Sequence, residues 1–177
     1  MQFIGLSGSL REHSFNSALI RLAAQLLPEH CSVEIYSCDL PLYNADLEAG
    51  GLPVAVKKLK QAIAGADGVI IATPEYNHGI AGVLKNAVDW ASRPAFESPL
   101  KDKPVAILSA SMSPLGGARA QTQLRSVMES ILCRIYPREF LLGTAHEVFD
   151  QEGQVRKPET AERLERFLGG YLSWMGG

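Results

Sequence analysis

The sequence predicts an α/β protein in which a parallel β-sheet is covered by helices on both faces. Short apolar segments rich in β-branched residues alternate five times with longer segments of helical periodicity. The run at residues 67–73 (DGVIIAT) is continuously apolar, as expected for a strand buried on both faces in the middle of such a sheet. A chain of 177 residues without a linker or repeat fits one domain, residues 1–177.

The chain begins with a strand, a helix and a second strand. Residues 2–7 form a short apolar run that ends at a glycine-serine turn, which indicates a buried first strand. Residues 14–27 carry apolar side chains at the i, i+3, i+4, i+7 spacing of an amphipathic helix, and Pro28 stops the pattern. Residues 32–37 alternate between apolar and polar side chains, which is typical of a strand.

The middle of the chain supplies two more helices around the central strand. Residues 40–48 contain a proline and little periodicity, so we expect an irregular loop there. Residues 53–64 open with a proline and then follow helical spacing. The strand at residues 67–73 comes next, and residues 80–92 return to a helical pattern.

The last third completes the alternation. Residues 103–109 predict a fourth buried strand, and residues 118–132 predict a long helix. A fifth strand is expected over residues 135–142, with less regular patterning. Residues 151–157 are polar and turn-like, and residues 158–174 form a terminal amphipathic helix.

Composition and charge exclude several classes of protein. The apolar share of 46% and the charged share of 20% are typical of a globular chain rather than a disordered one. The net charge of −2 shows no excess of positive charge of the kind that nucleic-acid-binding proteins use. Neither a signal segment nor an apolar run of membrane-spanning length is seen, so we expect a cytoplasmic protein without a membrane partner. Cys31, Cys38 and Cys133 match no metal or redox spacing, and we expect them to be reduced.

Three polar, glycine-containing loops follow the first, third and fourth strands, at residues 8–16, 74–79 and 109–117. If the strands are ordered 2-1-3-4-5, these three strands are neighbours in the sheet. Ligands of open parallel sheets bind at the carboxyl ends of the strands, near the point where strand order reverses. The sequence therefore predicts that the three loops form one continuous binding mouth.

The first loop, GSLREHSFN, has the composition of a phosphate site. It supplies hydroxyls at Ser9 and Ser14, a guanidinium at Arg11 and an amide at Asn16, while Gly8 permits a tight turn. The start of a helix adds unpaired N–H groups and partial positive charge. The alternative is an ordinary capped helix, with Ser14 as the N-cap and Arg11 solvated.

Four segments together resemble the NADPH-dependent FMN reductase family, whose members include quinone, chromate and azo-dye reductases. They are GSLREHSFN, LPLYN, PEYNHGIAGVLKNAVDWASR and GGARAQTQLR, in this order along the chain, and the resemblance runs from about residue 2 to residue 125. It implies a flavodoxin-like three-layer sandwich with a five-stranded parallel sheet in the order 2-1-3-4-5.

The resemblance also implies a set of FMN-binding residues. They would surround the phosphate, run along the flavin ring edge with their main chain, or lie near its pyrimidine end. In chain order they are Ser9, Arg11, Ser14, Phe15, Asn16, Pro74, Glu75, Tyr76, Asn77 and Ser111. No side chain is assigned as a catalytic acid or base, because fixed N–H dipoles can stabilise the charge that grows on a flavin ring during reduction.

Several positions near these loops allow more than one interpretation. For Glu75 we expect a loop-fixing or subunit-contact role rather than general-base chemistry, and for His78 a loop or interface role rather than substrate contact. Ser113 and Pro114 depart from the family pattern, in which a glycine precedes the glycine pair. A serine there would need a left-handed backbone conformation if the family glycine does.

Four further side chains lie outside the three loops or at their borders. Arg119 and Arg125 could meet a nicotinamide phosphate, but we favour solvated surface charges. We expect Trp90 at an interface, since similar family helices help to build a dimer. Tyr43, in the LPLYN segment, is expected to reach toward a partner's flavin site.

The implied function is an NAD(P)H-dependent, FMN-containing oxidoreductase with a ping-pong scheme. Electrons would pass from NADPH or NADH to a small acceptor such as a quinone, flavin, azo dye or metal oxyanion, in a homodimer or homotetramer. No G-x-G-x-x-G dinucleotide fingerprint is present, which fits a nicotinamide that binds only transiently. Two alternatives stay open. One is a flavodoxin-type electron carrier, and the other is a flavin-free phosphate-binding regulator.

Overall fold

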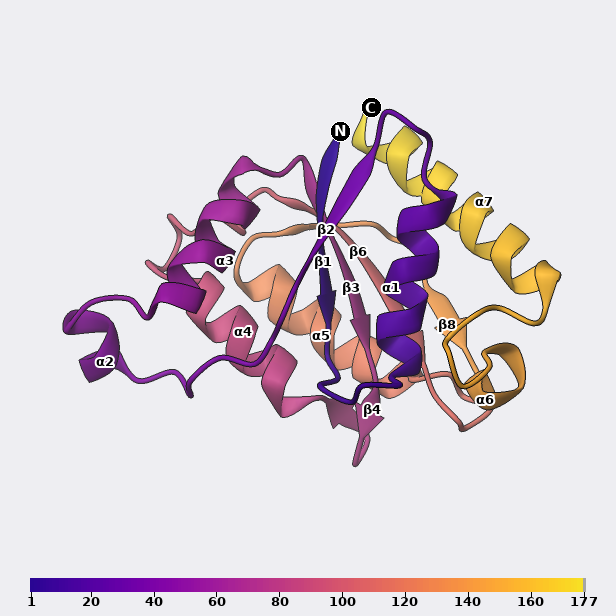
Figure 1. Ribbon diagram of the computed structural model, residues 1–177. Helices are drawn as coiled ribbons and strands as arrows, with labels where there is room; N and C mark the ends of the chain where they lie inside the picture. Colours follow the sequence, from indigo (N-terminus) through magenta and orange to yellow (C-terminus); the bar gives the residue numbers. More distant parts are fainter. Residues whose placement is uncertain (177) are drawn as a thin grey trace.

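A computed structural model describes residues 1–176 and shows a central sheet between two layers of helices (Figure 1). The strands of the sheet are β1 (Gln2–Ser7), β2 (Ser32–Tyr36), β3 (Gly68–Thr73), β6 (Pro104–Ala110), β7 (Arg134–Ile135) and β8 (Phe140–Leu142). Their order is β2-β1-β3-β6, with both β7 and β8 paired to β6, and every pair is parallel. This confirms the predicted α/β class and the order 2-1-3-4-5.

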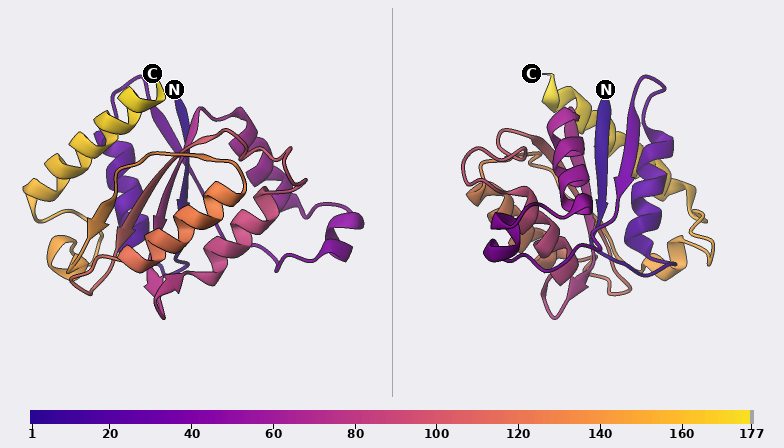
Figure 2. Two further views of the ribbon diagram at one scale, coloured as in Figure 1. Left: turned by 180° about the vertical axis from the view of Figure 1, so that it is seen from behind. Right: turned by 60° about the vertical axis from the view of Figure 1, so that its left-hand side comes forward.

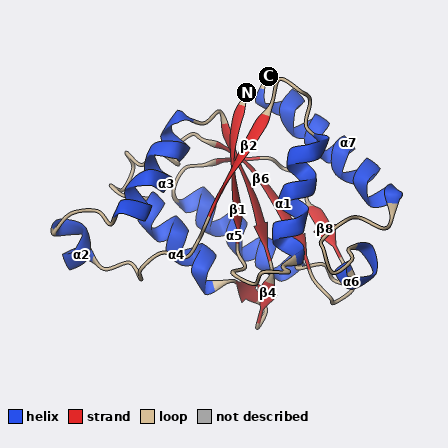
Figure 3. Ribbon diagram, viewed as in Figure 1, coloured by secondary structure: helices blue, strands red, loops and turns tan. Residues whose placement is uncertain are grey.

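The helices divide between the two faces of the sheet (Figures 2 and 3). One face carries α1 (Phe15–Leu26) and α7 (Pro158–Met175), and the other carries α3 (Val54–Gly65), α4 (Gly82–Ala91) and α5 (Ala118–Ser130). Two short helices, α2 (Ala45–Ala49) and α6 (Ala145–Val148), were not expected from the sequence. No helix within residues 1–176 is long and apolar enough to cross a bilayer.

Strand β3 shows why the sheet is buried on both faces. Val69 and Ile71 pack into the core beneath α3, α4 and α5, whereas Ile70 and Ala72 pack into the core beneath α1 and α7. All four side chains are fully buried. Successive side chains of a strand point to opposite faces, so the continuous apolar run fills both cores.

The fifth strand differs from its prediction over residues 135–142, because it is divided into β7 and β8 with Pro137 between them. Proline has no N–H for the strand ladder. Arg125 holds the connecting segment, since its guanidinium donates to Tyr136 O at 3.1 Å and to Arg138 O at 2.7 Å. Arg125 is therefore a structural clamp, and the expectation of a solvated charge was wrong for this residue.

The segment before α2 is fixed against α4 by side chains of that helix. Asn86 accepts from Tyr43 N at 2.8 Å and donates to Pro41 O at 3.0 Å, while Trp90 Nε1 donates to Pro41 O at 2.7 Å. Trp90 is fully buried within one chain, so it is a core residue and not the expected interface residue. Tyr43 packs edge-on against it with ring centroids 5.0 Å apart, and its reach toward a partner stays a prediction.

Gly68→Ala is expected to lower the free energy of unfolding by about 1–3 kcal/mol, because the new Cβ would overpack a filled core. It would collide with the hydroxyl of Tyr171 and lie 3.1 Å from the Phe3 ring. Tyr171 cannot easily yield, since it is fully buried and its hydroxyl donates to Pro104 O at 2.9 Å. Urea denaturation followed by circular dichroism measures the loss. Gly65→Ala is the control, because nothing lies within 4 Å of its Cβ, and an equal loss there would contradict the packing explanation.

Candidate functional site

The carboxyl ends of β1, β3 and β6 bring the three predicted loops to one edge of the sheet. The amide of Gly8 donates to Ala72 O at 2.8 Å, which ties the first loop to β3. The side chain of Asn16 spans to the end of β6, where it donates to Ala110 O and accepts from Ala110 N, both at 2.9 Å. The structure therefore joins the loops as the strand order predicted.

The start of α1 has the backbone geometry of an anion-binding site. Ser14 is its N-cap, and the Ser14 hydroxyl accepts from Ser17 N at 3.3 Å. Ala18 N donates to Ser14 O, so the amides of Phe15 and Asn16 remain at the helix start without an intrahelical acceptor. Two such N–H groups and the helix dipole favour a bound phosphate. Capping by Ser14 is thus compatible with a phosphate site.

The other residues of the first loop differ in their burial and in their contacts. Ser9 is half-buried, its hydroxyl accepts from Arg11 N at 3.4 Å, and Arg11 itself is exposed. The Phe15 ring stacks on Phe149 with centroids 6.3 Å apart. Both polar atoms of the buried Asn16 side chain are bonded to Ala110, so its backbone N–H and the second hydrogen of Nδ2 are the donors left for a phosphate. The Asn16 side chain therefore joins the first loop to the end of β6, and its contact with a phosphate stays a prediction.

The second loop is a β-hairpin, a feature that the sequence did not predict. Strands β4 (Glu75–Tyr76) and β5 (Gly79–Ile80) are antiparallel, and the two residues between them have left-handed backbones, with φ of 50° for Asn77 and 66° for His78. Positive φ at both central residues is typical of a tight two-residue hairpin turn. The preceding Pro74 is buried, whereas the hairpin tip is exposed to solvent. The hairpin therefore presents main chain at the edge where a flat ring could lie.

Glu75 fixes this hairpin to α5. Its Oε2 accepts from Arg119 N at 3.0 Å and from Ala120 N at 3.3 Å, at the start of the helix. Its side chain is only 12% exposed. Burial raises the pKa of Glu75, but backbone hydrogen bonds from Ala120 and Arg119 and the positive charge of Arg119 outweigh it and hold the pKa below its usual value. This geometry agrees with the loop-fixing role expected for Glu75.

Gln123 is a second clamp on the same hairpin, because its Oε1 accepts from Ile80 N at 2.7 Å. Sequence reasoning missed this residue, and no local signal separates it from other glutamines on a helix surface. At the tip, Arg119 Nη1 lies 2.8 Å from His78 Nδ1, so a donating guanidinium requires that nitrogen to be unprotonated. The His78 side chain is 72% exposed and has the loop position that was expected.

Glu75→Gln is expected to lower stability at neutral pH and to have a smaller effect in acid. A carboxyl whose folded-state pKa is depressed contributes stability above its ordinary pKa of about 4.5, and this is lost as pH falls through the lower folded-state value. The gap in unfolding free energy between wild type and variant should therefore shrink below about pH 4.5. Urea titrations from pH 3 to pH 7 measure it. Glu165→Gln, on the exposed face of α7, is the control, and a gap independent of pH would contradict the assignment.

The third loop is held by the segment after β8. Ser111 N donates to Leu142 O at 3.0 Å, and Ala145 N donates to Ser111 O at 2.9 Å. The left-handed residues are Gly116, with φ of 62°, and Gly117, with φ of 86°, and Ser113 is not among them. The departure from the family pattern at Ser113 and Pro114 therefore does not force a serine into a left-handed backbone conformation. Ser111 itself is half-buried beside the first loop's anchor at Ala110.

The residues present fit a phosphate-bearing flavin. The start of α1 offers unpaired amides, and the hairpin and third loop offer main chain at the same edge. Among residues 1–176 no group of three or more side chains that could hold a metal ion occurs. The NADPH-dependent FMN reductase family matches residues 1–147, a range that contains all three loops.

The chain belongs to this family. An NAD(P)H-dependent FMN reductase of Pseudomonas aeruginosa (strain PAO1) is 40% identical over 99% of the chain and 95% of its own length. A quinone reductase of Escherichia coli (strain K12) is 39% identical over 93% of the chain and 89% of its own length. Among solved structures, a flavoenzyme NAD(P)H:(acceptor) oxidoreductase of Paracoccus denitrificans is similar with a TM-score of 0.88 and 32% identity, covering 99% and 97% of the two chains. The predicted flavodoxin-like class, the FMN cofactor and the oxidoreductase activity of the FMN reductase family are thereby confirmed.

Proposed function

We propose that this protein oxidises NADPH or NADH through bound FMN and delivers the two electrons to a small acceptor of the quinone type. The observation that carries the proposal is the joining of three family loops at one edge, beside a helix start with two unpaired amides. The quinone reductase of Escherichia coli among the relatives supports the acceptor class.

In this proposal FMN supplies a ring that accepts hydride and passes electrons on. The amides of Phe15 and Asn16, the hydroxyls of Ser9 and Ser14 and the guanidinium of Arg11 hold the phosphate. The main chain of Pro74, Glu75, Tyr76 and Asn77, together with Ser111, positions the ring. Glu75 and Gln123 act behind the hairpin by keeping it against α5.

The second and third loops carry exposed apolar side chains. They are suitable for an acceptor that binds in the place from which the nicotinamide has dissociated. Tyr76, Met112 and Leu115 are 51%, 62% and 52% exposed, and they belong to the second and third loops. Such side chains offer apolar contact to a planar acceptor without strong shape selection. A flavodoxin-type carrier is disfavoured by the family assignment and by a net charge of only −2.

We also propose a homodimer or a homotetramer in the cytoplasm. Leu42, Val54 and Phe96 are 81%, 72% and 69% exposed, which is unusual for large apolar side chains and favours burial against a second copy. Sedimentation equilibrium over a range of concentrations would measure the mass. A monomer throughout would contradict this part of the proposal.

The deciding experiment is an anaerobic absorbance spectrum of the FMN-loaded protein before and after NADPH is added. We expect the bound-flavin band to bleach with NADPH and to return when a benzoquinone follows. A band that persists with both NADPH and NADH would favour the carrier. Failure to bind FMN would overturn the site assignment.

A further inference from the structure

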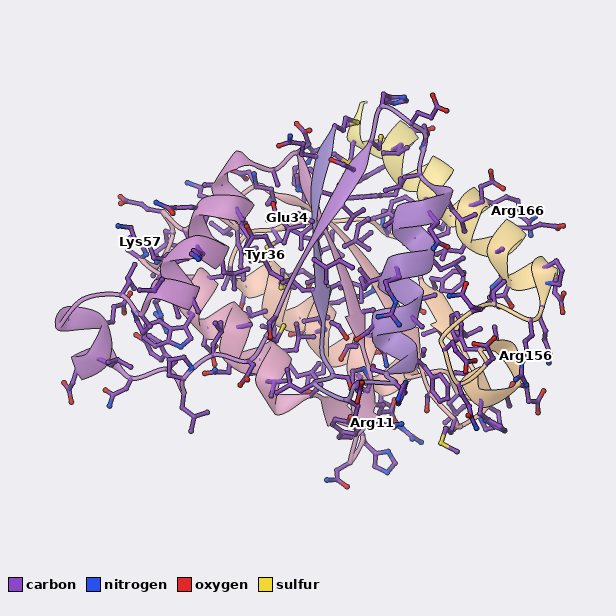
Figure 4. All side chains as sticks on the ribbon, in the orientation of Figure 1. Arg11, Glu34, Tyr36, Lys57, Arg156 and Arg166 are labelled. Atoms are coloured by element: carbon purple, nitrogen blue, oxygen red, sulfur yellow. The ribbon has the colours of Figure 1, made fainter. Side chains whose placement is uncertain are left out.

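The buried hydroxyl of Ser109 closes the third loop. Ser109 lies next to the carboxyl end of β6, is fully buried, and donates to Gly116 O at 2.5 Å, seven residues along the chain. On the neighbouring strand β3, the buried hydroxyl of Thr73 donates only to the adjacent Pro74 O, at 2.9 Å. The bond from Ser109 therefore fixes the far end of the loop, at the edge of the sheet where Figure 4 labels Arg11.

The side chain of Gln121 orients that hydroxyl. Gln121 is fully buried on α5, and its Nε2 donates to Ser109 Oγ and to Phe140 O, both at 2.8 Å. Phe140 O can only accept, so the amide has to present its nitrogen on this side. Because Ser109 Oγ receives a hydrogen from Gln121, its own hydrogen is left for Gly116 O. The hydrogen bonds therefore run in one direction, from Gln121 through Ser109 to the loop.

The Gln121 amide makes these bonds at a cost. Its Oε1 is buried and has no hydrogen-bond partner within residues 1–176. A buried amide oxygen without a partner is unfavourable and uncommon, and a methionine of similar length would avoid it. The contribution of this side chain therefore lies in the two bonds that its nitrogen donates.

The peptide between Gly116 and Gly117 passes this orientation on. The peptide is trans, so its C=O and N–H point in opposite directions, and Gly117 N–H points away from Ser109. The loop lies directly on Ser109, since a Cβ at Gly117 would be 2.9 Å from Ser109 Cβ. Within residues 1–176 no oxygen accepts from Gly117 N, whereas Ala118 N donates to Leu115 O at 3.3 Å. Gly117 is buried, so its N–H is a donor that remains available to a ligand.

We propose that Gln121 is a positioning residue of the flavin site, which acts through Ser109 to aim the Gly117 N–H at the pyrimidine end of bound FMN. The inference rests on the proposed function, since the family resemblance places the third loop at that end. Reduction of a flavin adds negative charge to its pyrimidine ring, and a fixed N–H dipole stabilises that charge more than it stabilises the oxidised ring. The Gln121–Ser109 pair therefore strengthens the binding of reduced FMN relative to oxidised FMN.

Ser109→Ala tests this inference, because it removes the hydroxyl that holds Gly116 O. Fluorescence quenching of the FMN-free protein measures the affinity for oxidised FMN, and anaerobic dithionite titration of the FMN-loaded protein measures the midpoint potential. We expect the affinity for oxidised FMN to change by less than about threefold, while the preference for reduced FMN falls by about tenfold, which lowers the potential by about 30 mV. Ser130→Ala is the matched control and should change neither quantity, since its exposed hydroxyl bonds Val127 O at the other end of α5.

Gln121→Met shows whether Gln121 acts through Ser109. Methionine has a similar length but donates no hydrogen bond, so the Ser109 hydroxyl is no longer held in one direction. We expect a smaller fall in the preference for reduced FMN, of about threefold. The double variant should match Ser109→Ala alone, because two residues that act through one bond are not additive.

Three outcomes would overturn the inference. The first is an equal loss of affinity for oxidised and reduced FMN in Ser109→Ala, which would mean that the hydroxyl only stabilises the fold. The second is a preference for reduced FMN that neither variant changes, and the third is full additivity in the double variant. Because dithionite reduces a flavin without nicotinamide, these outcomes leave the proposed function standing. Bound FMN that neither NADPH nor NADH reduces in the wild type would instead contradict the proposed function.

Discussion

Asn16→Leu is expected to lower the free energy of unfolding by about 2–4 kcal/mol, because two buried backbone groups lose their partner. The Asn16 side chain is buried at 3% exposure and bonds both the N–H and the C=O of Ala110 at 2.9 Å. Leucine has the same branched arrangement of side-chain heavy atoms but no polar atom, so it leaves both groups of Ala110 unsatisfied. Urea denaturation of the FMN-free protein measures the loss.

The same substitution should also weaken FMN binding, since Asn16 joins the first loop to the strand that carries the third. Gln25→Leu is the matched control, because Gln25 lies on the exposed face of the same helix and its amide can remain in water. We expect that control to change stability by less than about 0.5 kcal/mol. Equal losses in the two variants would show that the Ala110 bonds are not the cause.

Arg11→Ala is expected to raise the dissociation constant for FMN by about tenfold to hundredfold. A hydrogen bond to a charged group contributes about 1.5–3 kcal/mol, and Arg11 is the side chain of the first loop that supplies a formal positive charge to the phosphate. Quenching of flavin fluorescence during titration of the FMN-free protein measures the constant.

Two further variants separate charge from geometry in that experiment. Arg11→Lys keeps the charge but loses the planar fork, so we expect an intermediate loss. Arg21→Ala removes one exposed positive charge from α1, the helix that follows the first loop, and should have little effect. Undiminished FMN affinity in Arg11→Ala would refute the assignment of this loop to the phosphate.

The sequence alone determined the architecture. Periods of two and 3.6 residues in the apolar pattern located the strands and helices that build the sheet and its two layers, most within one or two residues. Ser14 was recognisable as an N-cap because capping is a local event, in which the partner lies three residues away. The alternation of strands and helices then required the loops to meet at one edge.

The tertiary structure decided what the polar side chains of that edge do. Asn16 bonds Ala110, 94 residues away, and Glu75 bonds Arg119, 44 residues away. Arg125 became a clamp because Pro137 interrupts the last strand and leaves carbonyls within its reach. The packing of strands and helices determines these bonding partners, so they cannot be inferred from the local sequence. The pattern of apolar residues thus fixes where each loop lies, whereas contacts between loops determine which groups remain available for a ligand.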